Sequence, residues 1–123
     1  MRRLIVIISL FLSLISAAQN NAWFEKGNSL YNEGKFTEAI EAYERILESE
    51  FHSSELYYNL GNAYYKLNRI APSIYYYEKA LQLSPKDEDV LNNIAFARNM
   101  TIDAIEVIPE IGFSKIMKER HSV

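Results

Sequence analysis

Residues 55–67, with the sequence ELYYNLGNAYYKL, and residues 70–81, with the sequence IAPSIYYYEKAL, decide the fold of this chain. The same pattern begins 34 residues earlier. A shift of that length superimposes Gly27 on Gly61, Asn28 on Asn62, Tyr31 on Tyr65, Ile40 on Ile74, Tyr43 on Tyr77, Glu44 on Glu78 and Leu47 on Leu81. A fixed period of this length is typical of a chain built from repeated helix pairs.

Each repeat carries the spacing of an amphipathic helix pair. Ile40, Tyr43 and Leu47 recur at intervals of three and four residues, which gives the second helix of the pair one buried stripe. Gly34 and Asn68 tolerate a left-handed backbone and are expected at the turns within the pairs. The pattern predicts helices over residues 20–33, 36–49, 54–67, 70–83 and 88–103.

The residues at the repeated positions resemble those of the tetratricopeptide repeat (TPR) family. The second unit carries the family pattern as Tyr57, Leu60, Gly61, Tyr64, Ser73, Tyr77, Ala80 and Pro85. The first unit carries it as Trp23, Gly27, Leu30, Ala39, Tyr43 and Ile46, with Phe51 in place of the proline. The resemblance implies an all-α, helix-turn-helix solenoid with two full repeats and a C-terminal capping helix.

The expected capping helix keeps only the start of a third repeat. Arg98 stands where the family pattern has a large apolar residue. Because a terminal helix needs one apolar and one solvated face, we expect one group to face the preceding pair, namely Leu91, Ile94, Ala95 and Ala97. We expect another group to remain solvated, namely Asp87, Glu88, Asp89, Asn92, Asn93 and Asn99.

The N-terminus has the composition of an export signal. Arg2 and Arg3 precede an apolar run from Leu4 to Ile15, and small residues follow at 16–18. This order predicts a secretory signal peptide over residues 1–18, with an uncleaved anchor as the alternative. We expect a TPR domain over residues 19–103, a weakly structured tail over residues 104–123, and a periplasmic or envelope-associated location.

Composition argues against several classes of function. Without Arg2 and Arg3, 11 basic residues face 16 acidic ones, a balance of −5, whereas nucleic-acid binding needs a basic patch. The chain has no cysteine, and its two histidines, His52 and His121, lie far apart, so no metal site is expected. It also lacks a phosphate-binding loop and a nucleophile motif, so we expect neither an enzyme nor a cofactor nor a small-molecule substrate.

The family resemblance implies that the first helix of each pair lines a concave groove for a protein or peptide partner. Asparagine and tyrosine dominate the expected lining, and both suit a peptide, because asparagine donates and accepts hydrogen bonds and tyrosine offers a rigid apolar face. Interhelix packing and plain solvation are the alternative roles for these side chains. The candidate groove residues are Phe24, Asn28, Tyr31, Asn32, Tyr58, Asn59, Asn62, Tyr65, Lys66, Asn92, Asn93 and Phe96.

Some TPR domains grip a C-terminal carboxylate with two asparagines and several basic residues. Asn28 and Asn59 occupy the matching asparagine positions, whereas the basic positions carry Phe24, Asp89 and Asn93. The loss of three basic positions disfavours an acidic C-terminal tail as the ligand.

Residues 55–67, 70–71 and 76–81, together with 101–109, resemble the TPR component of Bat aerotolerance operons. This resemblance implies an envelope protein that acts with membrane-anchored von Willebrand factor A-domain partners in stress or oxygen tolerance. Two alternatives stay open at this point: a structural unit that self-associates through its end helices, or a truncated relative that has lost its function.

Overall fold

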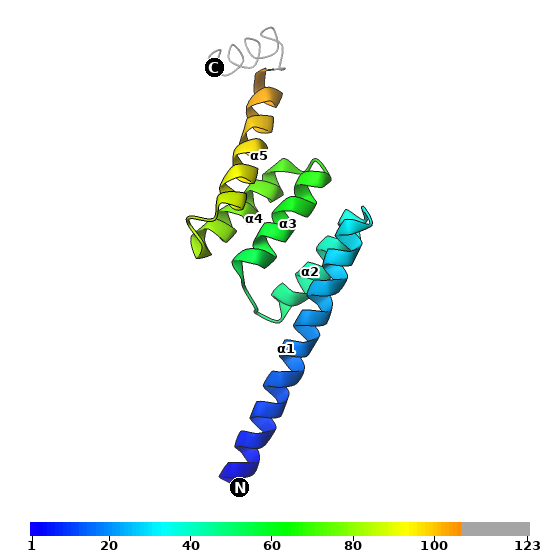
Figure 1. Ribbon diagram of the computed structural model, residues 1–123, viewed down its shortest axis with the longest axis vertical. Helices are drawn as coiled ribbons and strands as arrows, with labels where there is room; N and C mark the ends of the chain where they lie inside the picture. The colour runs from blue at the N-terminus through cyan, green and yellow to red at the C-terminus, as the bar shows by residue number, and fades with distance from the viewer. Residues whose placement is uncertain (107–123) are drawn as a thin grey trace, which may run out of the picture.

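The computed structural model is all-helical over residues 1–106, the part of the chain that the structure describes. Two antiparallel helix pairs stack side by side, and a last helix packs on the second pair (Figure 1). The expected two helix pairs plus a closing helix are confirmed. In chain order the helices are α1 (Arg2–Asn32), α2 (Phe36–Glu48), α3 (Ser54–Lys66), α4 (Ile70–Leu83) and α5 (Glu88–Glu106).

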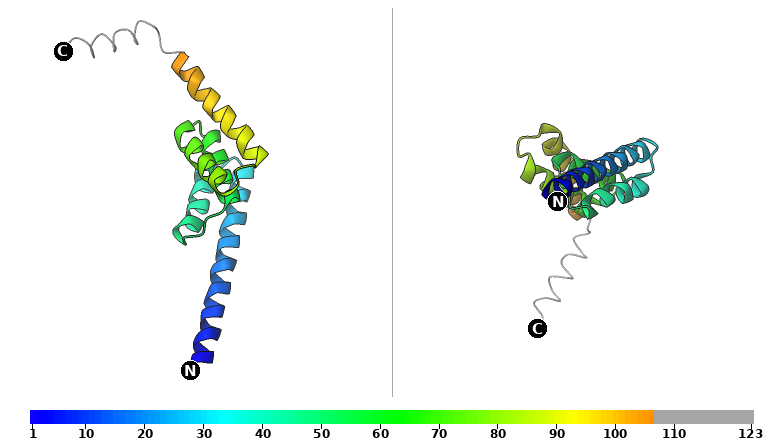
Figure 2. Two further views of the ribbon diagram at one scale, coloured as in Figure 1. Left: turned by 90° about the vertical axis from the view of Figure 1, so that its left-hand side faces the viewer. Right: turned by 90° about the horizontal axis from the view of Figure 1, so that it is seen from below.

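Helix α1 differs from its expected bounds, because it begins at Arg2 rather than near residue 20. No glycine or proline separates the apolar N-terminal run from the first repeat, so one helix of 31 residues continues through both. Ile5 and Phe11 are 64% and 67% exposed. The N-terminal half of α1 extends beyond the stacked pairs, at the end opposite to that of α5 (Figure 2).

The turns within the two helix pairs have the same geometry. Gly34 and Asn68 adopt φ of 78° and 59°, which confirms the expected left-handed conformation. The residue after each turn donates its backbone N–H to a carbonyl of the last helical turn, from Lys35 to Leu30 at 2.9 Å and from Arg69 to Tyr64 at 3.0 Å. These bonds satisfy carbonyl groups that the helix end would otherwise leave unpaired.

The second helix of each pair approaches the first across a glycine. A Cβ atom built at Gly61 would lie 2.5 Å from the ring of Tyr77, and the ring of Tyr43 lies equally close to Gly27. Both tyrosines are buried, at 1% exposure. The glycines therefore remove a steric obstacle to the two largest fully buried side chains of the core.

The contact between neighbouring repeats also recurs. Tyr64 donates its hydroxyl to Glu44 at 3.3 Å, and one repeat later Arg98 pairs with Glu78 at 3.4 Å. Arg98 therefore has a partner at the position where the family pattern expects an apolar residue. The repeated glutamates join adjacent units.

The buried face of α5 is made by Val90, Ile94 and Ala97, at 0–2% exposure. The expectation that Leu91 and Ala95 also face the preceding pair is wrong, because Leu91 is 43% exposed and Ala95 is exposed as well. The buried residues follow one another at intervals of four and three, whereas Leu91 and Ala95 lie on the neighbouring face of the same helix.

Candidate functional site

A concave groove lies across α1, α3 and α5 and consists of two adjoining hollows, which share Tyr31 and Asn62. The first hollow, of about 300 Å³, we call the Asn28 hollow; its lining residues are Asn28, Tyr31, Asn32, Tyr43, Glu55, Asn59 and Asn62. The second, of about 320 Å³, we call the Asn93 hollow; its lining residues are Tyr31, Tyr58, Asn62, Tyr65, Lys66, Tyr77, Asn93 and Phe96.

A hydrogen-bonded trio forms the floor of the Asn28 hollow. The Tyr43 hydroxyl donates to Oδ1 of Asn28 at 2.6 Å, and Nδ2 of Asn59 donates to the same oxygen at 3.1 Å. Asn28 therefore uses its carbonyl oxygen within the protein and keeps its Nδ2 protons for an outside acceptor. Asn59 is in the converse state, with its donor engaged and its Oδ1 available.

The Asn93 hollow repeats this trio one unit later. The Tyr77 hydroxyl donates to Oδ1 of Asn62 at 2.5 Å, and Nδ2 of Asn93 donates to the same oxygen at 2.9 Å. Nδ2 of Asn93 also lies 3.2 Å from the Tyr58 hydroxyl. The groove thus presents an alternation of unused amide donors, on Asn28 and Asn62, and unused carbonyl acceptors, on Asn59 and Asn93.

The groove tyrosines stay neutral over a wide pH range. Burial, with a smaller contribution from neighbouring Tyr31, raises the pKa of Tyr43 to about 12. Burial also raises the pKa of Tyr77 well above its usual value. The pKa of Tyr31 is raised by burial and by the proximity of Tyr58. At neutral pH these hydroxyl groups are therefore hydrogen-bond partners without charge.

The structure brings ten of the twelve candidate residues to the two hollows and leaves Phe24 and Asn92 outside them. Phe24 packs against the ring of Tyr43, with 6.0 Å between centroids, and lines a different hollow near the start of the repeat domain. Asn92 is exposed on α5. Because successive residues on a helix point about 100° apart, the rotation that brings Asn93 into the groove turns Asn92 away.

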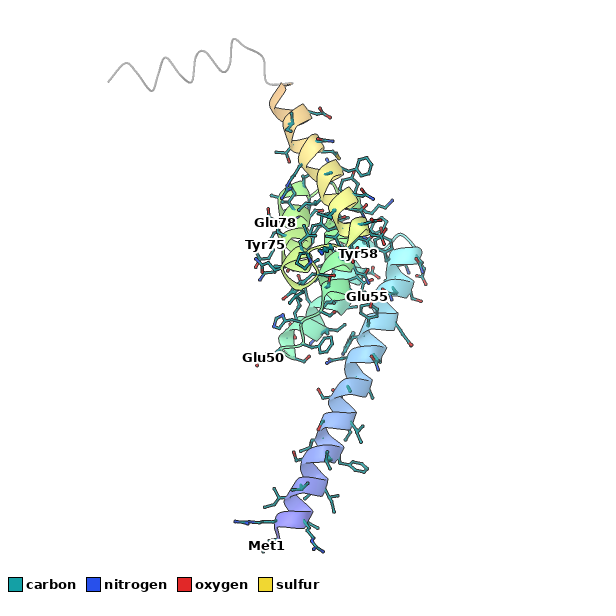
Figure 3. All side chains as sticks on the ribbon, turned by 60° about the vertical axis from the view of Figure 1, so that its left-hand side comes forward. Met1, Glu50, Glu55, Tyr58, Tyr75 and Glu78 are labelled. Carbon is teal, nitrogen blue, oxygen red and sulfur yellow. The ribbon has the colours of Figure 1, made fainter. Side chains whose placement is uncertain are left out.

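Three lining residues are absent from the sequence-based candidates. Tyr43 belongs to the predicted buried stripe, and Tyr77 is its equivalent one repeat later; their rings lie in the core, but their hydroxyl groups reach the groove floor. The signal for this role is the Asn-to-Tyr spacing of 15 residues that both units share. Glu55 lies in the first turn of α3 and points to the same side of the array as Tyr58, whereas Tyr75 and Glu78 lie on the other side (Figure 3). No cluster of metal-ligating side chains occurs within residues 1–106.

Stacked antiparallel helix pairs with a polar concave face define the class of helical-repeat scaffolds. The family model described as tetratricopeptide repeat matches residues 24–88. The chain belongs to the tetratricopeptide repeat family, whose scaffolds mediate protein interactions.

One curated protein and one solved structure are also similar to this chain. The Photosystem I assembly protein Ycf3 of Cyanophora paradoxa is 30% identical over 97 residues, which cover 73% of this chain. The chain spans 56% of that protein's length. The second TPR of Spaghetti (RPAP3), solved with an HSP90 peptide SRMEEVD, superimposes with a TM-score of 0.65 at 22% identity. The match covers 80% of this chain and 90% of that one, and it shows the shared fold.

Proposed function

We propose that this protein is an exported adaptor whose concave groove binds an extended segment of a partner protein. The carrying observation is the repeated amide alternation along the groove, with unused donors on Asn28 and Asn62 and unused acceptors on Asn59 and Asn93. An extended backbone offers both N–H and C=O groups at regular intervals. Such a backbone can use all four asparagines without depending on its own sequence.

Aromatic and charged side chains around the asparagines supply sequence preference. Tyr31, Tyr58 and Phe96 line the Asn93 hollow, where they accommodate apolar side chains. Glu55 lines the Asn28 hollow and Lys66 the Asn93 hollow. The groove therefore favours a segment with a basic residue near Glu55, an apolar residue in the middle and an acidic residue near Lys66.

An acidic C-terminal tail fits this groove poorly. RPAP3 was solved with a peptide that ends in two glutamates, a valine and an aspartate. In the present chain Asn93 occupies a position where clamp-type domains carry a basic residue, and its amide is already directed to Asn62 and Tyr58. The groove has one cation, Lys66, among its lining residues.

The N-terminal helix supports the proposed location, and the family resemblance supports the proposed partner. Residues from Leu4 to Leu14 are exposed and, apart from Ser9 and Ser13, apolar, and α1 includes a window with mean hydropathy 1.7, which suits export or anchoring. We place the protein outside the cytoplasm, with residues 1–18 as the signal. The Bat-like residues 55–67 and 76–81 support a membrane-anchored von Willebrand A-domain protein as the partner, in a complex linked to stress or oxygen tolerance.

The proposal is tested by affinity capture from solubilised envelope with the full chain as bait. Asn59→Ala removes one groove acceptor and costs the fold a single hydrogen bond at 3.1 Å. Gln82→Ala is the matched control, because Gln82 is an exposed amide on α4 that lines neither hollow. We expect the control to retain a protein that Asn59→Ala loses. Equal recovery by both variants would rule out the groove as the binding surface.

A further inference from the structure

No helix that the structure describes covers one face of α5, whereas α4 covers the corresponding face of α3 in the preceding repeat. Shifting by 34 residues places Leu91 of α5 on Tyr57 of α3, and Ala95 on Gly61. In the second repeat, α4 covers this face of α3, with the Tyr77 ring over Gly61 and Ser54 donating to the carbonyl of Ala80 at 3.2 Å. No described helix occupies the corresponding place beside α5.

The uncovered face of α5 carries exposed apolar residues near both of its ends. Leu91 and Ile102 are 43% and 53% exposed on this face, whereas Phe96 lies on the groove side of the helix. Ala95 lies between Leu91 and Ile102 on this face and allows a close approach of another helix. The opposite side of α5 is already fixed on α4 by its buried residues. The exposed stripe is therefore a second face, separate from the one that closes the array.

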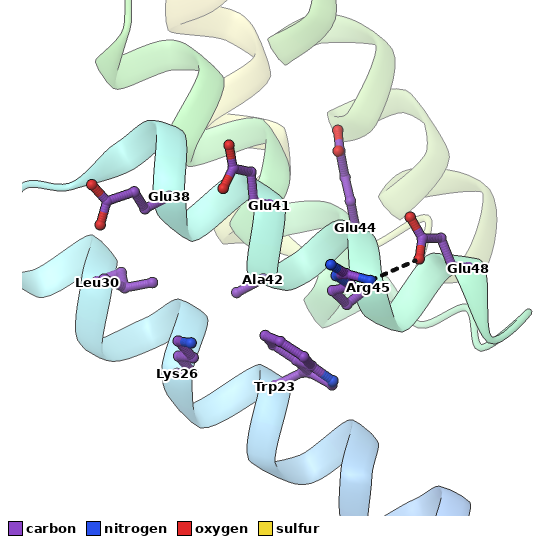
Figure 4. A pocket seen from close by; sticks show the side chains of 9 residues that line it. All are labelled: Trp23, Lys26, Leu30, Glu38, Glu41, Ala42, Glu44, Arg45 and Glu48. Carbon is purple, nitrogen blue, oxygen red and sulfur yellow. Dashed lines mark ion pairs between the residues drawn. The ribbon is translucent and has the colours of Figure 1, made fainter.

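The other end of the array does not offer such a surface. There the hollow between α1 and α2, of about 480 Å³, is bordered by Glu38, Glu41, Glu44 and Glu48 (Figure 4). At its centre, Lys26 and Arg45 flank the Trp23 ring at 5.1 and 5.6 Å. Lys26 is the equivalent of buried Leu60 one repeat earlier, so a charged side chain replaces an apolar one at this edge of the array. The α5 edge instead carries exposed apolar residues.

The charges beside the open face indicate what binds there. Glu88 and Asp89 lie in the first turn of α5 and Asp103 near its end, whereas Arg98 is directed to Glu78. An antiparallel pairing with α5 of a second copy would bring these acidic ends together, which is unfavourable. Basic residues at both ends of an incoming helix would instead complement them.

We propose that the α5 face formed by Leu91, Ala95 and Ile102 docks an amphipathic helix of a partner protein, with basic residues flanking its apolar stripe. The docked helix takes the place beside α5 that α4 takes beside α3. Its side chain opposite Ala95 is aliphatic or small, because the Ala95 methyl fills the space that admits Tyr77 over Gly61. This contact is independent of the groove.

The test uses the full chain and a synthetic peptide of about 16 residues, long enough for a marginal helix, with leucines on one face and lysines beside them. A second peptide replaces the lysines with glutamates. We expect the lysine peptide to bind, and the glutamate peptide to bind with an affinity at least about tenfold lower. Leu91→Glu and Ile102→Glu should each abolish binding, whereas Glu41→Gln at the charged edge and Asn59→Ala in the groove should not.

Three results would overturn the proposal. Equal binding of the two peptides would exclude the assigned chemistry. Binding that both exposed-face variants retain would place the peptide elsewhere, and circular dichroism of each variant establishes that it is folded. Absence of binding would assign the surface to a different occupant. A dimer formed through this face would make that occupant a second copy, and a cross-link from this face to residues 107–123 would make it the chain's own C-terminal segment. None of these three results changes the prediction for Asn59→Ala in the groove.

Discussion

Asn62 is expected to be far more important for stability than Asn59, although the two asparagines lie on the same groove. Oδ1 of Asn62 accepts hydrogen bonds from Tyr77 at 2.5 Å and from Asn93 at 2.9 Å, whereas Asn59 donates one bond at 3.1 Å. Asn62→Ala removes both bonds and leaves the hydroxyl of Tyr77, a residue 1% exposed, without its acceptor.

The magnitude follows from these contacts. An ordinary hydrogen bond contributes about 1 kcal/mol net, and a stranded buried polar group costs about 1–3 kcal/mol. Asn62→Ala should therefore lower the free energy of unfolding by about 2–3 kcal/mol, and Asn59→Ala by about 1 kcal/mol or less. In a domain of this size, a loss of 2 kcal/mol lowers Tm by about 8–16 °C.

Thermal and urea unfolding of the two variants and of Tyr77→Phe would test this reasoning. In the Asn62→Ala background, Tyr77→Phe removes the stranded hydroxyl, so the double variant should be more stable than the sum of the single effects by about 1 kcal/mol. Strict additivity, or equal costs for Asn62→Ala and Asn59→Ala, would show that the trio does not hold the groove floor. The expected result makes Asn59→Ala the cleaner variant for binding studies.

Three further perturbations report on the packing that positions the groove. Gly61→Ala should destabilise by up to about 2 kcal/mol in urea unfolding, because crowding Tyr77 costs about 1–3 kcal/mol and alanine's helix propensity recovers about 1; a stabilised variant would contradict the close approach. Ser53→Ala removes the side-chain cap of α3 and should cost about 1 kcal/mol, and an unchanged Tm would refute the cap. The free energy of unfolding should stay constant up to about pH 10 and fall between about pH 10 and 12. Burial raises the pKa values of Tyr43 and Tyr76 to about 12 in the folded state, so both residues ionise more readily in the unfolded chain. The absorbance of tyrosinate in the native protein measures this ionisation, and a titration identical to that of free tyrosine would contradict the prediction.

The repeat pattern was sufficient to predict the helix pairs, because its constraints are local. Gly34 and Asn68 allow a left-handed turn, and the spacing of Ile40, Tyr43 and Leu47 defines a single buried stripe. The helix ends lie within three residues of their predicted positions, apart from the start of α1, and the largest difference is the end of α5 at Glu106 instead of residue 103. The start of α1 differs because the expected boundary near residue 20 rests on the signal peptide predicted over residues 1–18, and no local breaker divides these residues from the first repeat.

The groove was harder to predict, because a side chain's role there depends on rotation about a helix axis. The sequence suggested that Asn92 and Asn93 are equivalent, whereas packing of Val90 and Ile94 turns only Asn93 inward. Tyr43 shows the same limit, since its ring belongs to the core and its hydroxyl to the groove. Neither distinction is visible before the interhelical contacts are known, and binding by these residues remains a prediction.

Site-specific photo-cross-linking in cells tests the central claim most directly, with a photoreactive residue in place of Tyr65 in the groove or of Gln82 on the exposed side of α4. The account predicts a cross-linked partner from position 65 that is lost with Asn59→Ala, and none from position 82. A cross-link from position 82 alone, or one from position 65 that Asn59→Ala leaves unchanged, would contradict groove binding.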